Sequence, residues 1–253
     1  MALNLRERFG LKAAAPTVSL TADFRFVPAE HASLREHKVV HEEVDVLEKP
    51  LAVDRVLLLS QGSDSLQLEL ALCLDGPAAA AELLFNRLEA FQREPQSDAV
   101  RDLAALAPGV GEPAVAWSWG QEDRNGVAGF VRHNVMALLQ GRFDTLPAQA
   151  REIDAALART PAGAGGTGAV EQASFEPATL RVPSGGRLEL GLPLRQGERH
   201  FFIASGGAVN RDPQDSQRHY FRAGLAKGPA RITVLRVGSG LLPSRQTLHI
   251  TIE

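Results

Sequence analysis

The sequence has almost no cysteine: Cys73 is the one thiol in 253 residues. A single cysteine excludes a disulfide within the chain. Cys73 lies in the apolar run 66–74, whereas activated thiols need polar, electropositive surroundings. We therefore interpret it as a small core residue. The lack of disulfides is typical of cytosolic proteins, and it also fits many proteins of the bacterial envelope.

The chain also has little net charge and no long apolar run. Its formal charge is −3 and its pI is near 6.2, which argues against a general nucleic-acid binder because such proteins carry a basic field. No apolar run reaches the ~20 residues that cross a bilayer, so we predict no transmembrane segment. Residues 1–12 carry charge without an apolar core, so they predict no signal peptide.

Motifs for nucleophilic, nucleotide or phosphate chemistry are missing as well. There is no G-x-S-x-G, no phosphate-binding glycine loop and no dinucleotide fingerprint. The glycines within 163–168 follow no predicted strand and open no predicted helix. We therefore predict no catalytic residue and no cofactor.

The strongest pattern lies in residues 126–157, which predict two strands followed by an amphipathic helix. The Asn-Gly pair at 125–126 suits a type I′ turn between apolar strands at 114–119 and 127–132. We expect Thr145 to cap the helix, whose first turn contains a proline, an acceptable position for that residue. Ala150, Ile153, Ala156 and Leu157 share one helical face.

The residues before this stretch predict more strands and a second helix opened by proline. Since strands and helices follow one another in two similar groups, we expect an α+β fold: an antiparallel sheet with helices on one face. A duplicated unit is the other reading. The predicted strands are 17–27, 39–47, 55–60 and 66–74, and the predicted helices begin near 77 and 97.

A break in composition at 160–169 predicts two domains. This segment contains small residues, no large apolar side chain and no charge, as flexible linkers do. We expect an α+β domain at 1–159 and a small immunoglobulin-like β-sandwich at 170–253, because short strands there alternate with turns and no helix is predicted. In 247–253 the alternation places Leu248, Ile250 and Ile252 on one face.

Two stretches resemble known bacterial domains. PGVGEPAV within 107–116, VAGFVRHNVMALLQG at 127–141 and AREIDAAL at 150–157 resemble bacterial extracytoplasmic and lipoprotein-type domains of unknown function. That resemblance implies an envelope location and a non-enzymatic α+β module, and it transfers no catalytic residue. His133 stands where many relatives have glycine.

The second resemblance covers the C-terminal strands. GPARITVLRV at 228–237 and TLHITIE at 247–253 resemble bacterial immunoglobulin-like and protease-inhibitor-like sandwiches. The Asn-Pro-Thr-Thr-Gly loop of the inhibitors is missing, so protease inhibition gains no support from the residues.

One group of side chains has the composition of a metal site. His31, His37 and His41 lie among glutamates, and the spacing of His37 and His41 would place both on one face of a helix. Valines at 39 and 40 favour a strand instead, in which the two histidines lie too far apart to share an ion easily. The competing interpretation is a solvated, charged connector.

Two further groups are candidates for interaction. Trp117 and Trp119 alternate along a strand, so they share a face that is either covered by a helix or open for recognition. Asn210, Asp212 and Asp215 lie in a polar loop that offers oxygen ligands or a surface for a partner.

These observations leave three hypotheses. The first is a non-enzymatic, two-domain binding or structural protein of the bacterial cell envelope with a protein partner. It would lie in the periplasm or at the cell surface if a signal peptide has been removed, and in the cytoplasm otherwise. The second is a metal-dependent enzyme that uses the three histidines. The third is a cytosolic interaction module of a larger assembly.

Overall fold

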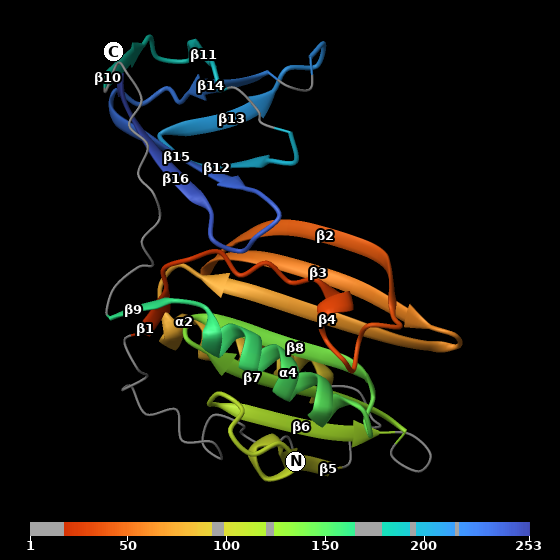
Figure 1. Cartoon of the computed structure of the whole chain (residues 1–253). Helices are drawn as coiled ribbons and strands as arrows, with labels where there is room; N and C mark the ends of the chain where they lie inside the picture. Colours follow the sequence, from red (N-terminus) through yellow and green to blue (C-terminus); the bar gives the residue numbers. More distant parts are fainter. Residues whose placement is uncertain (1–17, 93–98, 120–123, 165–178, 193–195, 216–217) are drawn as a thin grey trace. The chain divides into compact units, whose positions relative to one another are not determined.

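The computed structural model describes residues 18–92, 99–119, 124–164, 179–192, 196–215 and 218–253. The chain divides into two compact units, residues 1–169 and 170–253. The α+β class expected from the sequence is wrong, because the structure is mostly β: strands make up 51% and helices 18%. Figure 1 shows this dominance of strands in each unit.

The first unit is built on one seven-stranded sheet. Its order is β2-β3-β4-β8-β7-β6-β5, and every neighbouring pair is antiparallel. Two meanders therefore meet at the β4–β8 pair in the middle. The strands are β2 (Lys38–Glu48), β3 (Leu51–Gln61), β4 (Asp64–Cys73), β5 (Ala99–Asp102), β6 (Ala114–Trp119), β7 (Asn125–Arg132) and β8 (Val135–Arg142).

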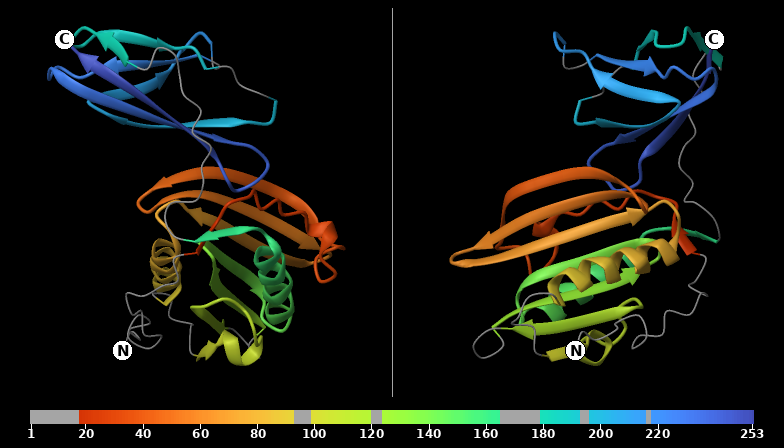
Figure 2. Two further views of the ribbon diagram at one scale, coloured as in Figure 1. Left: turned by 60° about the vertical axis from the view of Figure 1, so that its left-hand side comes forward. Right: turned by 180° about the vertical axis from the view of Figure 1, so that it is seen from behind.

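The two long helices lie on opposite faces of this sheet, not on one face as expected. Helix α2 (Pro77–Gln92) packs on β4, β7 and β8, and helix α4 (Leu146–Arg159) packs on β7 and β8. The left view in Figure 2 shows the strands between the two helices. Neither helix has the combination of length and apolar character that crossing a membrane requires. The short helix predicted near residue 97 is instead β5 followed by α3 (Leu103–Leu106).

The composition of β7 and β8 explains why helices cover both faces. Val127 to Val131 are all buried, without the alternation of a half-exposed strand. Phe130 and Leu138 are both buried, but they point in opposite directions. Leu138 belongs to the core beneath α2. Phe130 pairs with Ala137, the residue before Leu138, and neighbouring residues of a strand point to opposite faces, so Phe130 faces α4.

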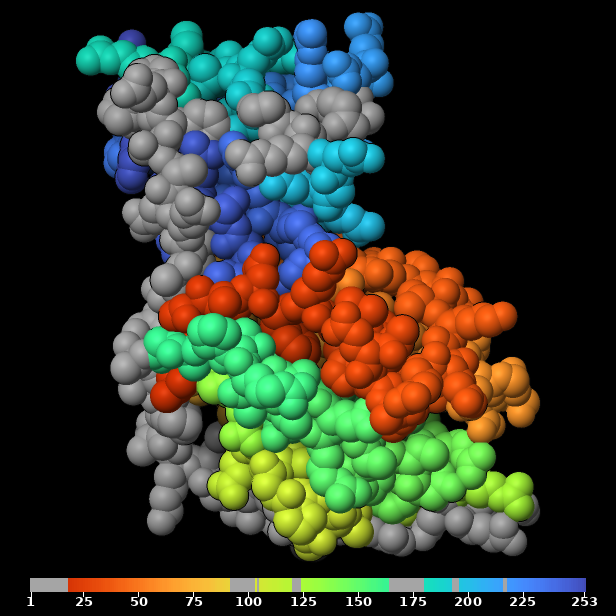
Figure 3. Space-filling model, viewed as in Figure 1, coloured from red at the N-terminus to blue at the C-terminus, as the bar shows by residue number. Residues whose placement is uncertain are grey.

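Residues before β2 complete the cover on the α4 side. Leu20, Phe24, Phe26 and Leu34 are at most 5% exposed, and Ser33 donates from its backbone amide and its hydroxyl to the Glu152 carboxylate on α4. Figure 3 shows this segment and α4 lying side by side over the strands. The segment contains β1 (Val18–Leu20) and the 3-10 turn η1 (Pro28–Glu30), so much of the strand predicted at 17–27 is irregular.

Strand β1 pairs with β9 (Ala162–Ala164), which lies inside the segment predicted as a linker. The pair is antiparallel, with Val18 opposite Ala164. The buried Asn134 side chain accepts from the Leu20 amide at 2.8 Å and donates to the Cys73 carbonyl at 2.7 Å. The start of the predicted linker is thus part of the first unit, and 165–169 lie outside the described residues.

The second unit has two sheets that share one core, which is compatible with a β-sandwich. One sheet has the order β10-β16-β15-β12 and the other β11-β14-β13. Leu248, Ile250 and Ile252 lie in the core, as the alternation predicts. The strands are β10 (Thr179–Val182), β11 (Arg187–Leu190), β12 (Arg199–Ser205), β13 (Gly207–Arg211), β14 (His219–Ala223), β15 (Gly228–Val237) and β16 (Ser244–Ile252).

Candidate functional site

A cavity of about 370 Å³ lies in the first unit, near the β3–β4 turn. It draws residues from β3, β4, β6, β7 and β8, so strands distant in sequence form one site. A volume of this size is within the range of small-molecule sites, about 300–1,000 Å³. The lining residues are Leu58, Ser63, Asp64, Ser65, Gln67, Trp119, Asn125, Gln140, Gly141 and Arg142.

Strand register brings these side chains together in two adjacent rows. In the first row Leu58 is opposite Gln67, and Gln67 is opposite Gln140. In the second row Trp119 of β6 is opposite Asn125 of β7, and Asn125 is opposite Arg142 of β8. Because side chains two residues apart share a face of a strand, both rows lie on the face that carries Leu138 and the core beneath α2.

The polar lining marks where the cover by α2 ends. On β8, Met136 and Leu138 belong to the core beneath the helix, and the next side chain on that face is Gln140. On β4 the same change occurs between buried Ala71 and exposed Gln67. The cavity is thus an open part of a sheet face whose other part is closed by the helix.

Trp119 forms the aromatic wall of the cavity. Its ring lies 6.3 Å from that of Phe91 on α2, with an angle of 27° between the ring planes. Trp119 is partly exposed, whereas Trp117 is 1% exposed and lies in the core. The structure therefore separates the two predicted tryptophans: Trp117 packs beneath the helix, and Trp119 faces the cavity.

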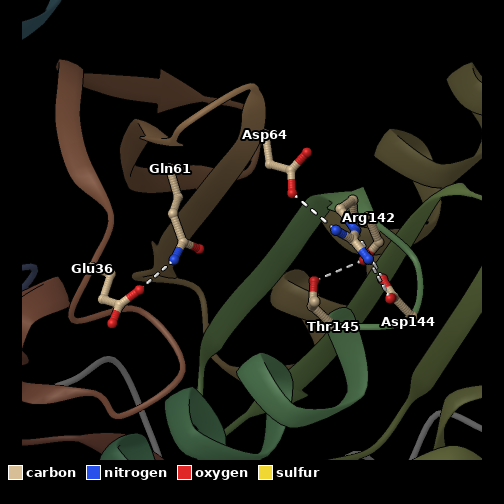
Figure 4. Close-up of polar contacts among 6 residues, drawn as sticks. All are labelled: Glu36, Gln61, Asp64, Arg142, Asp144 and Thr145. Atoms are coloured by element: carbon tan, nitrogen blue, oxygen red, sulfur yellow. Dashed lines mark hydrogen bonds and ion pairs between the residues drawn. The ribbon is translucent and has the colours of Figure 1, made fainter.

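Arg142 is held at the rim by two carboxylates. Its guanidinium donates to Asp64 at 3.1 Å and to both oxygens of Asp144, at 2.6 and 3.2 Å (Figure 4). The hydrogen bond from Arg142 lowers the pKa of the Asp144 carboxyl. Thr145 donates its hydroxyl to the Arg142 carbonyl and makes no side-chain cap to helix α4, contrary to the sequence prediction. All three charges at this rim are thus engaged with one another.

The remaining polar side chains of the cavity have unused hydrogen-bonding capacity. Among the described residues, Gln67, Asn125 and Gln140 have no side-chain hydrogen bond to another protein group. Each amide offers two N–H donors and one carbonyl acceptor. A ligand in the cavity would therefore meet free donors and acceptors without first displacing a protein contact.

A buried charged group lies farther along the same sheet face. Arg87 of α2 donates to Glu69 at 2.8 Å and to Asp54 at 3.3 Å, and both carboxylates belong to residues that are 6% exposed. Burial, then the neighbouring Glu69, raises the pKa of Asp54 to about 7. A carboxylate pair of this kind is typical of acid–base sites. Here it joins α2 to the sheet and has little access to solvent.

The three histidines proposed for a metal lie in different surroundings. His31 stacks on Phe26 at 4.8 Å, His37 precedes β2, and His41 is exposed on β2 with Glu43 3.9 Å away. Among the described residues, which include all three, no group of three or more histidine, cysteine or acidic side chains could hold a metal. The thiol of Cys73 is buried, and burial raises its pKa to about 12.

The polar loop of the second unit uses its oxygens internally. Asp212 accepts from the Gln214 amide at 2.9 Å and from Arg187 at 2.8 Å, and these bonds lower the pKa of its carboxyl. Asp215 pairs with Arg218 at 3.2 Å, and Asn210 donates weakly to the Ala208 carbonyl at 3.4 Å. These three residues point to no shared ligand.

Sequence reasoning missed the two glutamines of the cavity. A signal was present, since Gln67 alternates with leucines in β4 and Gln140 directly follows the apolar run 135–139 of β8. That the two are opposite each other follows from the β4–β8 pairing, which joins segments 73 residues apart in sequence and has no local marker. Comparison of the chain with protein-family models gave no match, and comparison with curated proteins gave none.

Proposed function

We propose that this chain is a non-enzymatic ligand-binding protein of the bacterial cell envelope and that the cavity at Trp119 is its binding site. The observation that carries the proposal is the set of unpaired amides beside a partly exposed aromatic ring. Pockets that bind small molecules combine an apolar wall with a few convergent polar groups. Trp119 and Leu58 provide the wall, and Gln67, Asn125 and Gln140 provide the polar groups.

Binding is favoured over catalysis by the chemistry of the lining. The charged side chains of the lining, Asp64 and Arg142, are paired with each other, and general acid–base or nucleophilic catalysis needs a group free to exchange a proton or attack. The titratable pair Asp54 and Glu69 is closed in beneath α2. These features support a site that holds its ligand without altering it.

A protein partner, expected from the sequence, stays a prediction, and the exposed edge strand β2 is the feature that would favour it. Val39 and Val40 on this strand are 47% and 61% exposed. The strand also has a register shift between Val39 and His41 and several carboxylates, both of which discourage pairing with another strand. We therefore place binding in the cavity.

Retention of small molecules tests the proposal. The purified protein would be incubated with the small-molecule fraction of the source cell, separated from unbound material and denatured, and the released compounds identified by mass spectrometry. We expect a compound that is retained by the wild type and lost with Trp119→Ala. Gln61→Leu is the matched control, because Gln61 is exposed and bonds Glu36 on the opposite face of the sheet (Figure 4).

Retention that is equal in the wild type and in Trp119→Ala would refute the cavity as the site, and so would the lack of any retained compound. Location is tested separately by fractionating the source cell. Recovery with periplasmic or surface markers supports the envelope proposal, and recovery with cytoplasmic markers contradicts it.

A further inference from the structure

We infer that the ligand of this cavity is a neutral saccharide of more than one ring, with one sugar ring against Trp119 and the hydroxyls of another on the glutamine amides. This inference rests on the proposed function and adds the chemical class of the ligand. Three properties of the site lead to it: the kind of hydrogen-bonding groups, the balance of charge and the aromatic wall.

The hydrogen-bonding groups match hydroxyls. Gln67 and Gln140 are direct cross-strand partners, so their side chains lie side by side at the spacing of neighbouring strands, about 5 Å. Each amide can donate and accept, and each hydroxyl of a sugar does the same. Two adjacent hydroxyls on one ring therefore suit two adjacent amides, with Asn125 and the serines at 63 and 65 left for the rest of the saccharide.

The balance of charge disfavours ionic ligands. An anion would approach Asp64, and it would have to compete with Asp64 and Asp144 for the guanidinium of Arg142. A cation would have to compete with that same guanidinium for the two carboxylates. A neutral ligand can bind without breaking either ion pair of Arg142, so the site favours a neutral ligand over an anion or a cation.

The aromatic wall suits a sugar ring. Phe91 packs nearly parallel to the Trp119 indole, which fixes the position of the ring while Trp119 remains part of the cavity lining. The face of an aromatic ring carries partial negative charge, and the C–H groups on one face of a pyranose carry partial positive charge. Stacking of the two leaves the sugar hydroxyls at the ring edge, and Asn125 is the cross-strand neighbour of Trp119.

Tryptophan fluorescence can report this binding directly. The chain has two tryptophans, so Trp117→Phe leaves Trp119 as the reporter. The indole nitrogen of Trp117 is buried without a hydrogen-bond partner, so phenylalanine removes an unsatisfied donor and should be tolerated. Titration calorimetry on the wild type gives the same affinities without any substitution.

The probes would be maltose, cellobiose and N,N′-diacetylchitobiose, with glucuronic acid and glucosamine as charged sugars. We expect saturable binding of at least one neutral disaccharide, and binding of the charged sugars at least tenfold weaker. Gln140→Leu should weaken the neutral disaccharide at least tenfold, whereas Gln61→Leu should leave its affinity unchanged. Circular dichroism would confirm that each variant is folded.

The outcomes separate this inference from the proposed function. If no neutral saccharide binds, but a compound from the cell is retained and lost with Trp119→Ala, the saccharide class is overturned and the binding site stands. Tighter binding of a charged sugar than of every neutral one also overturns the inference. If neither saccharide nor cell-derived compound binds, both proposals fall.

Discussion

Replacing Asp54 with asparagine should stabilise the first unit relative to the wild type as the pH rises. Burial and the neighbouring Glu69 raise the pKa of Asp54 from its ordinary value of 3.8 to about 7, against the opposing effect of Arg87. The folded state therefore binds this proton more tightly than the unfolded state. Protonated Asp54 therefore stabilises the folded wild type fully below pH 4, and this contribution is lost as the pH rises through 7.

The size of the effect follows from the two pKa values. Each pKa unit between the folded and unfolded states corresponds to about 1.4 kcal/mol, so a rise from 3.8 to about 7 sets an upper bound of about 4 kcal/mol. The attraction of Arg87 is already contained in that pKa. Asparagine has nearly the same shape and no charge to bury. Between pH 4 and pH 8 the free energy of unfolding of Asp54→Asn should therefore rise by about 2–4 kcal/mol relative to that of the wild type.

Urea unfolding at several pH values between 4 and 8, followed by tryptophan emission, measures this difference. Both tryptophans belong to the first unit, so the signal does not include the second. Asp144→Asn is a control of opposite sign: Arg142 lowers the pKa of the Asp144 carboxyl, so that variant should be less stable than the wild type by a nearly constant amount from pH 4 to pH 8, and the loss should disappear only below pH 4. A difference between Asp54→Asn and the wild type that stays constant from pH 4 to pH 8 would refute the reasoning.

Three further predictions concern packing. Phe130→Ala should cost roughly 3–5 kcal/mol in urea unfolding, because the side chain is fully buried; a cost below about 1 kcal/mol would contradict its position. Gly111→Ala should lower the free energy of unfolding by roughly 1–3 kcal/mol, since its methyl group would overlap the Val131 carbonyl. Unchanged stability would show that residue 111 and the Val131 carbonyl are less closely packed. Deleting 247–253 should abolish cooperative melting of the second unit and leave the first folded, because β16 is an inner strand. As a control, His249→Ala on the exposed face of β16 should change stability by at most about 0.5 kcal/mol.

Local signals in the sequence were sufficient for much of the secondary structure. The proline-opened helix begins at 77, as predicted. The turn predicted at 125–126 is wrong, because Asn125 and Gly126 are the first residues of β7 and pair with Trp119 and Ser118. The choice of faces also failed. The run 127–131 is apolar at every position, which indicates a strand covered on both sides, and giving it a single covered face led to the expectation of helices on one side.

The candidate site was less accessible from the sequence than the fold. Trp119 was recognised, but alternation alone grouped it with Trp117, which the structure places in the core. The two differ because Trp117 lies nearer the middle of β6 under α2, whereas Trp119 lies at the end of the strand. Pairing of Gln67 with Gln140 depends on long-range register, which is determined by the packing of the whole sheet.

The short β1–β9 pair has a consequence for the response of the first unit to tension. Val18 and Ala164 are partners, so the chain enters and leaves the pair at the same end. A force applied through the two flanking segments would load the rungs one after another, as in a zipper, instead of shearing them all together. Beyond Leu20 the bond to Asn134 comes under load. We therefore expect a low-force first step in single-molecule pulling, in which β1 and β9 peel away while the seven-stranded sheet remains folded.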